Sequence, residues 1–336
     1  MPSLPRDTPV WALAAAGLRA GAPVALLCVV RSHGSSPGRQ GFKMCVTATA
    51  VAGSIGGGIM EHKWVELARQ RLLAGDDAPL LRPQIHRREA PADRSGMMCS
   101  GEQEVLLLGL TAADLPAVAA IVAALESGSG GALELSAAAG LQVRAAAISA
   151  DASAPASEDG VPFYDYQPGP AWRYREQLGF RDHVTIVGGG HVSLALSRVL
   201  AALEFAVTVL DDRPNLPTLA ANDAARHRCV VDYDALAAAV PPGPHRYVVV
   251  MTVGYRTDAV ALRQLLGRPY RYLGVLGSAA KVAELRRGLL ADGFSAEAVA
   301  GLRGPIGLPI ASQTPEEIAI SIAAELIQVR HAGAAP

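Results

Sequence analysis

The sequence has few aromatic residues, no paired cysteines, no long apolar runs and no excess of positive charge. Aromatic residues make up 5% of the 336 residues, whereas 50% are hydrophobic, so the core is built mainly from alanine, valine, leucine and isoleucine. The 30 basic and 31 acidic residues give a formal net charge of −1. Proteins that follow nucleic-acid phosphates need clustered lysine and arginine, so we expect no nucleic-acid partner.

No apolar run approaches the ~20 residues of a membrane-spanning helix, so we expect no membrane association. Residues 11–18 are apolar, but charged residues flank them and helical periodicity explains them, so we predict no signal peptide. There is no Cys-x-x-Cys pair among the four cysteines, which are Cys28, Cys45, Cys99 and Cys229. A reduced, cytoplasmic protein is the simplest interpretation.

The C-terminal half alternates short β-branched runs with helical patterns. The runs are almost continuously apolar, which is typical of strands buried on both faces of a parallel sheet; they lie at 183–187, 206–210, 228–231, 247–251 and 272–276. Helical patterns follow at 192–204, 234–240, 258–266, 281–292 and 314–329. This alternation predicts a Rossmann-like, doubly wound parallel sheet over residues 177–336.

The N-terminal half indicates a mixed α+β domain over residues 1–148. Helices are predicted at 10–19, 59–73 and 116–127, and strands at 24–30, 43–49, 81–87 and 102–108. Residues 149–171 are rich in alanine, serine, aspartate, proline and glycine and follow neither hydrophobic period. We therefore predict a linker over residues 149–176, which gives an α/β protein of two domains.

A glycine-rich turn, GGGHVS, occupies residues 188–193 between a predicted strand and a predicted helix. Gly188 and Gly190 match the first two glycines of a dinucleotide fingerprint, and Asp211 ends the next strand, where a ribose-binding carboxylate is expected. Such a turn offers backbone amides to a pyrophosphate. The same turn also serves packing alone, so both interpretations stay open. His191 either meets a ligand or is simply a polar residue at a helix start.

A second glycine-rich turn, GSIGGG, occupies residues 53–58 and leads into a predicted helix. Consecutive glycines permit unusual backbone angles and expose successive amides, which can hold an anion. The alternative is a sharp or flexible connection without a ligand. The candidate residues are Gly53, Ser54, Gly56, Gly57 and Gly58. Glu61 follows in the first helical turn, where a carboxylate complements the helix dipole.

Two motifs that resemble catalytic ones fail on mechanism. Ser36 sits in a Gly-x-Ser-x-Gly sequence, but Pro37 has no N–H for an oxyanion hole. Ser278 begins a Ser-x-x-Lys sequence, and we predict it to be a helix N-cap. Cys99, in a polar loop, is a candidate ligand for a soft metal or a sulfur-bearing group. The histidines have no metal-ligand spacing, so we expect no bound metal.

Together these segments resemble the XdhC/CoxI family, the accessory proteins of molybdenum hydroxylases such as xanthine dehydrogenase. The resemblance covers nearly the whole chain. In the N-terminal half it rests on HGSSPGRQGFKMCVT (33–47), GSIGGGIME (53–61) and MCSGEQEVLLL (98–108). In the C-terminal half it rests on VTIVGGGHVSLAL (184–196), VTVLDDRP (207–214), YVVVMT (247–252), YLGVLGSAAKVAEL (272–285) and PIGLPIASQTPEEIAISIAAELI (305–327).

The resemblance implies a non-enzymatic chaperone, often a homodimer, that binds molybdenum cofactor (molybdopterin) and delivers it to an apo molybdenum hydroxylase. Cofactor-maturation or sulfurase enzymes are further implied partners. The expected N-terminal ligand-facing set is Ser35, Ser36, Gly53, Ser54, Gly56, Gly57, Gly58, Glu61 and Cys99. The expected C-terminal set is Gly188, Gly190, His191 and Asp211. The alternative is an NAD(P)-dependent oxidoreductase that binds a dinucleotide in its Rossmann domain.

The chain departs from the family pattern at three positions. Many relatives have cysteine where this sequence has Ile59, and two histidines where it has Val253 and Tyr255. Thr252 and Asp258 of the same stretch are retained. Any role of that thiol or those imidazoles is therefore absent here or is performed by other groups. The sequence leaves open which hydroxylase is the client and whether the two halves form one site or two.

Overall fold

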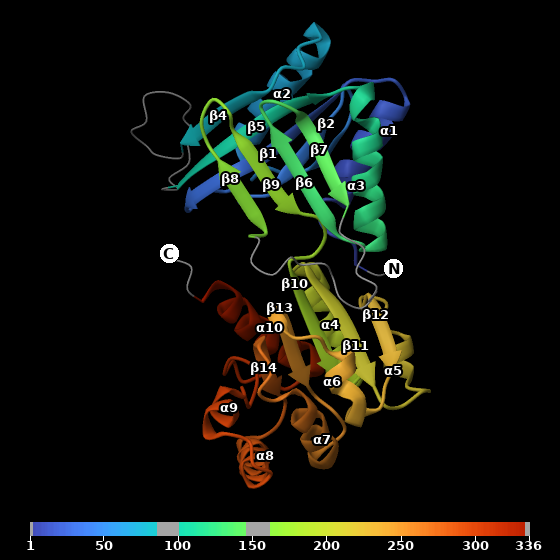
Figure 1. The fold of residues 1–336 in the computed structure, drawn as a ribbon, viewed down its shortest axis with the longest axis vertical. Coiled ribbons are helices and arrows are strands. Elements are labelled where there is room, and N and C mark those ends of the chain that lie inside the picture. The colour runs from blue at the N-terminus through green and yellow to red at the C-terminus, as the bar shows by residue number, and fades with distance from the viewer. Residues whose placement is uncertain (1–2, 86–100, 146–161, 333–336) are drawn as a thin grey trace. The chain divides into compact units, whose positions relative to one another are not determined.

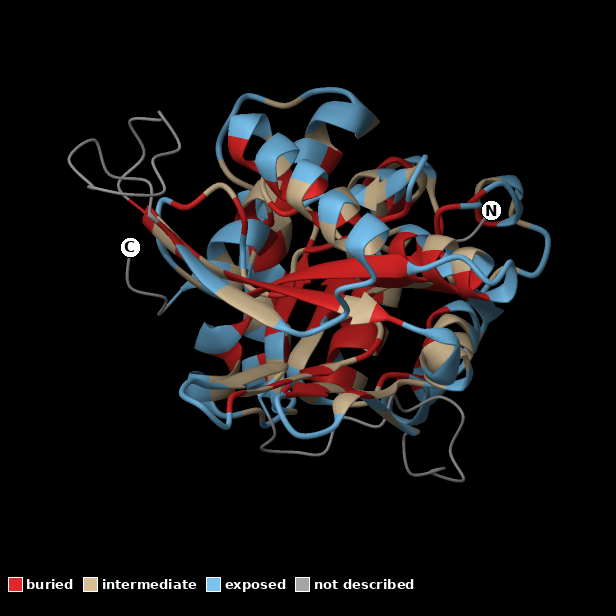
Figure 2. Ribbon diagram, turned by 90° about the horizontal axis from the view of Figure 1, so that it is seen from above, coloured by how far each residue is buried: buried red, intermediate tan, exposed pale blue. Residues whose placement is uncertain are grey.

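A computed structural model describes residues 3–85, 101–145 and 162–332, which form two compact units (Figure 1). The N-terminal unit spans residues 4–179, and the C-terminal unit begins at residue 180. In both units buried residues follow the central strands, and exposed residues lie on the outer sides of the helices (Figure 2). None of the helices within the described ranges is long and apolar enough to cross a membrane.

The N-terminal unit contains two antiparallel sheets. The first has the order β3-β2-β1-β5-β4, from β1 (Val24–Gly34), β2 (Lys43–Val46), β3 (Val51–Gly53), β4 (Leu80–Ile85) and β5 (Gly101–Leu110). The second has the order β7-β6-β9-β8, from β6 (Gly131–Ser136), β7 (Gly140–Ala145), β8 (Tyr164–Gln167) and β9 (Arg173–Gln177). The helices are α1 (Thr8–Arg19), α2 (Gly58–Ala74) and α3 (Leu115–Ser127), with a 3₁₀ turn, η1 (Ala112–Asp114), before α3.

Strand β1 is buried on both faces, which explains its unbroken apolar run. Leu26 and Cys28 face a core shared with α1, α3 and the second sheet. Ala25 and Leu27 face a separate core that contains Trp64 of α2. An antiparallel sheet covered on both faces thus needs the same continuous hydrophobicity as a buried parallel strand.

The linker prediction for residues 149–176 is wrong from residue 164 onward. Strands β8 and β9 lie there, and β9 pairs with β6 from Ala132↔Gln177 to Ser136↔Arg173. In β9 the residues are alternately partly buried and buried, with Tyr174 and the polar Glu176 buried, whereas the residues of β8 are partly buried or exposed. This pattern of tyrosine, arginine and glutamate is easily taken for a loop.

The C-terminal unit is a parallel sheet of five strands in the order β12-β11-β10-β13-β14. The strands are β10 (Asp182–Val187), β11 (Phe205–Asp211), β12 (His227–Val230), β13 (Gly243–Val250) and β14 (Tyr270–Val275). The helices are α4 (His191–Ala202), α5 (Pro217–Ala220), α6 (Leu236–Ala239), α7 (Tyr255–Leu265), α8 (Ala279–Ala291), α9 (Ala296–Gly301) and α10 (Pro315–His331). A 3₁₀ turn, η2 (Tyr233–Ala235), precedes α6.

This order confirms the predicted Rossmann-like sheet. Numbered within the unit, the strands run 3-2-1-4-5, so the order reverses between β10 and β13. One core packs α4 and α10 against the sheet, and a second packs α7 and α8 against it. Thr314 caps α10, since its hydroxyl accepts a hydrogen bond from the Glu317 amide.

A buried lysine joins the two sheets of the N-terminal unit. The Lys43 side chain on β2 is fully buried, and its Nζ lies 2.6 Å from Glu176 Oε1 on β9 and 2.7 Å from Asp7 Oδ2. It also donates to the Gly41 carbonyl, and the Tyr174 hydroxyl donates to Glu176. Burial alone would lower the pKa of Lys43, but Asp7 and Glu176 outweigh it and raise this pKa well above its usual value. The lysine is therefore charged and fixes β9 against β2.

We expect Lys43→Met to destabilise the N-terminal unit by about 3–5 kcal/mol, because it leaves two carboxylates without their buried cation. Urea unfolding followed by tryptophan fluorescence measures this, since Trp11, Trp64 and Trp172 all lie in this unit. The matched control is Lys63→Met at an exposed position on α2. A loss below about 1 kcal/mol for Lys43→Met would show that the cluster does not hold the sheets together.

Candidate functional site

The GSIGGG turn holds a carboxylate of its own chain. Gly56, Gly57 and Gly58 have φ values of +127°, +75° and +72°, which turn successive amides inward. Glu61 Oε2 accepts hydrogen bonds from the amides of Ile55 (2.9 Å) and Gly57 (2.8 Å). It also accepts one from the Ser54 hydroxyl at 2.7 Å. The turn therefore has the predicted anion-binding geometry, and Glu61 is the anion bound in it.

The neighbouring loop of residues 35–38 packs directly on this turn. The Gly38 amide donates to Gln103 Oε1 at 2.9 Å, and Gln103 Nε2 donates to the Ile55 carbonyl at 3.2 Å. A Cβ atom on Gly38 would lie 2.1 Å from the Ile55 oxygen, and one on Gly56 would lie 2.5 Å from the Gly38 nitrogen. These two glycines are required by backbone packing, whereas Gly57 has open space at its Cβ position.

Three of the predicted ligand-facing residues serve other roles or stay apart. The Ser36 side chain is buried and its hydroxyl donates to the Gly38 carbonyl at 2.7 Å, so in this structure the hydroxyl serves the loop itself. Gly53 belongs to β3, where a Cβ atom would meet the Lys43 carbonyl oxygen at 2.3 Å. Ser35 is exposed beside this loop. Cys99 lies outside the described residues.

A series of buried, hydrogen-bonded polar side chains, which the sequence analysis missed, supports the two loops. Trp64 Nε1 on α2 donates to Gln84 Oε1 on β4 at 3.0 Å, and Gln103 Nε2 lies 3.4 Å from the same oxygen. Gln84 and Gln103 are both buried within paired strands. In the sequence each is a neutral polar residue inside a predicted strand, which does not distinguish a buried, hydrogen-bonded side chain from a solvent-facing one.

In the C-terminal unit the GGGH turn joins β10 to α4 at the point where strand order reverses. Gly188 has φ +113°, and a Cβ atom there would lie 2.3 Å from the Met251 carbonyl oxygen of the loop after β13. Gly190 is the N-cap of α4 and has open space at its Cβ position. His191 is exposed at the first position of the helix. The turn thus occupies the crevice where open α/β sheets bind ligands.

Asp211 lies at the predicted place, but its carboxylate is already occupied. It is fully buried, and Oδ2 accepts a hydrogen bond from the Gly189 amide at 2.6 Å. Both oxygens also accept from the Arg213 guanidinium at 2.8 Å. Burial alone would raise the pKa of Asp211, but the hydrogen bonds from Arg213 and the Gly189 amide outweigh it and lower this pKa. In this structure Asp211 positions the glycine turn and presents no free oxygen to a ribose.

A second cluster at this edge was not predicted. Asp258 on α7 is fully buried, and its Oδ1 accepts from the Thr252 amide at 3.0 Å and the Thr252 hydroxyl at 2.6 Å. Lys281 on α8 forms an ion pair with Asp258 and donates to the Leu276 carbonyl. Through its hydrogen bonds with Thr252, Asp258 therefore holds the turn after β13 in place. Ser278 caps α8 by accepting from the Lys281 amide, as predicted.

The three departures from the family pattern all lie on the surface of the chain. Ile59 is 61% exposed, Val253 is 74% exposed and Tyr255 is 40% exposed. They therefore replace the side chains of relatives without disturbing either core. Within the described ranges, no group of three or more histidine, cysteine, aspartate or glutamate side chains is arranged to hold a metal ion.

The fold and the two glycine turns define a two-unit α/β protein with a Rossmann-type C-terminal unit. The XdhC Rossmann domain matches residues 184–326, and the XdhC and CoxI family matches residues 17–82. The chain belongs to the XdhC/CoxI family.

Similar proteins come from several bacteria. An uncharacterized protein of Escherichia coli, YqeB, is 32% identical over 156 residues, which are 46% of this chain and 28% of that protein. A probable subunit of the xanthine dehydrogenase of Bacillus subtilis is 29% identical over 150 residues, 45% of this chain and 43% of that protein. This chain thus spans less than half the length of either relative. A crystal structure of a xanthine dehydrogenase from Bacillus halodurans shares the fold, with a TM-score of 0.69 at 21% identity over 97% of this chain and 98% of the other.

We expect Asp211→Asn to loosen the turn between β10 and α4, because a neutral amide cannot hold both the Gly189 amide and the Arg213 guanidinium. Charge-assisted hydrogen bonds of this kind contribute about 1.5–3 kcal/mol. Hydrogen exchange of the amides of β10 and α4 measures the loss at pH 7. Because the pKa of Asp211 is lowered by folding, its stabilisation is present above the unfolded-state pKa and is lost as the pH falls below about 4.

The wild type and Asp211→Asn should therefore become more alike in acid. The control is Asp212→Asn, at a neighbouring position that is 40% exposed. We expect it to change protection by less than about 0.5 kcal/mol. Equal effects of the two substitutions at pH 7 would show that Asp211 does not organise the turn.

Proposed function

We propose that this protein is an accessory chaperone that binds molybdenum cofactor and delivers it to an apo molybdenum hydroxylase of the xanthine dehydrogenase type. Membership of the XdhC/CoxI family supports an accessory role. One matched protein is named as a probable subunit of xanthine dehydrogenase, which supports a hydroxylase of this kind as the partner. The cofactor is cargo in this proposal, so the protein itself is not the oxidoreductase.

The observation that carries the proposal is the carboxylate held by main-chain amides in the GSIGGG turn. The amides of Ile55 and Gly57 bind Glu61 at the N-terminus of α2, where the helix dipole also favours negative charge. The phosphate of a pterin cofactor is also an anion that accepts hydrogen bonds from main-chain amides at a helix N-terminus. Because Glu61 occupies both amides, the phosphate binds by replacing the Glu61 carboxylate, which turns outward into solvent.

This exchange suits a carrier better than a permanently open site. Without a ligand, the amides of the turn stay paired with Glu61. When phosphate binds, it replaces Glu61, so the free energy of binding is only the difference between the two anions on the same amides. A carrier needs such reversible holding groups and a partner for release, rather than a positioned acid and base. Gly57, open at its Cβ position, leaves room for the incoming group.

The strand order of the C-terminal unit favours a second candidate, an NAD(P)-dependent oxidoreductase. Against it, Asp211 is buried and paired with Arg213, so the ribose hydroxyls lack their usual acceptor. Calorimetric titration with NADH separates the two functions. Micromolar binding together with turnover of a carbonyl substrate would favour the enzyme, and we expect neither.

We expect Glu61→Gln to bind molybdopterin at least several-fold more tightly than the wild type. The substitution removes the charge that competes for the Ile55 and Gly57 amides and keeps a neutral acceptor of the same size. The measurement is the pterin content of protein produced with cofactor synthesis intact, from fluorescence after oxidation, together with titration of added molybdopterin.

Glu66→Gln on the exposed side of the same helix is the matched control and should bind like the wild type. Unchanged or weaker binding by folded Glu61→Gln would place the phosphate elsewhere. If neither the wild type nor any variant contains or binds pterin, the chaperone proposal itself fails.

A further inference from the structure

A cavity of about 270 Å³ lies in the N-terminal unit, away from the GSIGGG turn. Strand β1 begins at Val24 beside the cavity and ends at Gly34 beside the loop that packs on the GSIGGG turn. Eleven residues of strand separate the two ends, roughly 35 Å. Three connections surround the cavity: α1 to β1, α2 to β4, and β5 to η1. It is therefore distinct from the site of the proposed function.

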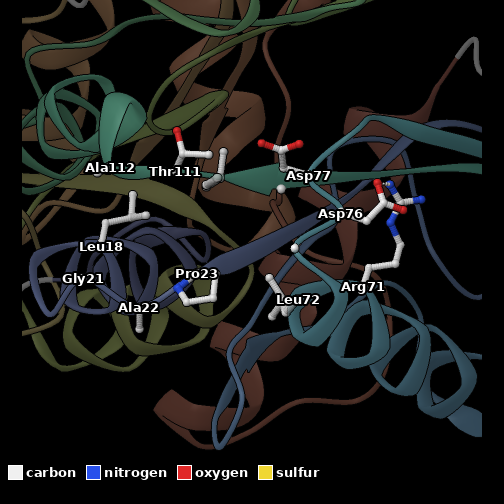
Figure 3. Close-up of a pocket in the computed structure, with 13 residues that line it drawn as sticks. Leu18, Gly21, Ala22, Pro23, Arg71, Leu72, Asp76, Asp77, Thr111 and Ala112 are labelled. Carbon is white, nitrogen blue, oxygen red and sulfur yellow. Dashed lines mark hydrogen bonds and ion pairs between the residues drawn. The ribbon is translucent and has the colours of Figure 1, made fainter.

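The walls of the cavity are mainly apolar. Leu18 of α1 and Leu110 of β5 are buried, and Leu72 of α2 is partly buried. Figure 3 shows Leu18, Pro23 and Leu72 around one opening, with the carboxylates of Asp76 and Asp77 at its edge. The space equals that of about nine liquid waters. A single six-membered ring with a short arm fits it.

The charge at the edge of this cavity is negative. Arg71 NH2 lies 2.8 Å from Asp76 Oδ1 and also donates to the Ala78 carbonyl, so this cation is already paired. Asp77 has no hydrogen bond or ion pair to any side chain or amide in the described parts of the chain. Its backbone is held against β5, since a Cβ atom on Gly109 would lie 2.5 Å from the Asp77 Cα. Asp77 is thus an exposed residue with a fixed backbone, and its carboxylate has no counter-charge among the described residues.

Two helix ends add to this charge. The last turns of α1 and α2 both line the cavity, and each helix C-terminus carries roughly half a negative charge. An anion placed here would meet Asp77 and both helix ends, whereas Arg71, the basic residue among those that line the cavity, is engaged by Asp76. A neutral apolar group would cover the leucines but leave Asp77 unpaired.

We propose that this cavity binds a small amphipathic cation, namely a primary amine on a compact apolar body. The apolar body covers Leu18, Leu72 and Leu110, and the ammonium pairs with Asp77. Neither the glycine turns nor the cofactor takes part, so this inference stands or falls independently of the chaperone function.

The test compares three probes of the same shape on the full-length protein: benzylamine as its cation, benzyl alcohol and benzoate. Ligand-observed NMR titration gives the affinities, and hydrogen exchange over residues 71–77 locates the site. We expect the cation to bind at least tenfold more tightly than the alcohol, and benzoate not to bind. Equal binding of the three probes would overturn the proposal.

Two variants and a control sharpen this test. Asp77→Asn should reduce the affinity for benzylamine to that for benzyl alcohol, because only the charge is lost. Ala112→Phe, at an exposed position on the rim, should abolish binding of both probes by filling the opening. Asp165→Asn, in the second sheet, should leave both affinities unchanged. Wild-type affinity for benzylamine in folded Asp77→Asn would refute the assignment of the ammonium to Asp77.

Discussion

A carboxylate of the chain itself binds the backbone amides of a glycine-rich turn in each of the two units. Glu61 does so at the start of α2, and Asp211 does so beside the start of α4. Amides without a partner are costly, so in each turn a side-chain acceptor of the chain itself pairs with them. The two anions differ in one respect: Glu61 is partly exposed, whereas Asp211 is fully buried and locked by Arg213. We therefore propose that the first exchanges with a ligand, whereas the second holds its turn in place.

In the N-terminal unit, the buried ion pairs of Lys43 define how the two sheets are arranged, which apolar packing alone would not do. The two sheets enclose a shared hydrophobic core. Lys43 adds a directional constraint to this core, because its amine must meet Asp7, Glu176 and the Gly41 carbonyl at once. The cost of desolvating the charges is offset by this full set of partners. Specific geometry, more than added stability, is what such a buried cation provides.

The sequence predicted the parallel sheet well because its central strands are largely buried and its helices are bounded by caps such as Ser278 and Thr314. The sequence analysis did not predict β8 and β9, because their many polar side chains obscure the alternation of apolar and polar residues. For the candidate site, the sequence identified the two glycine turns, but it did not predict that the carboxylates of Glu61 and Asp211 bind their amides. Which amide Glu61 or Asp211 holds depends on contacts between neighbouring loops, and Gln84 and Gln103 are joined only through pairing of β4 with β5. Such contacts leave no local pattern.

Helix α2 gives the N-terminal unit one further property. Its first turn carries Glu61 and its last turn carries Arg71, and its 17 residues form a rod about 25 Å long. Trp64 and Ala68 fix the middle of the rod in the core. A rotation or translation of the helix that withdraws Glu61 from the glycine turn must therefore also displace Arg71. A rigid displacement of α2 therefore couples the GSIGGG turn at one end of the helix to Arg71 at the other, although no residue is common to both ends.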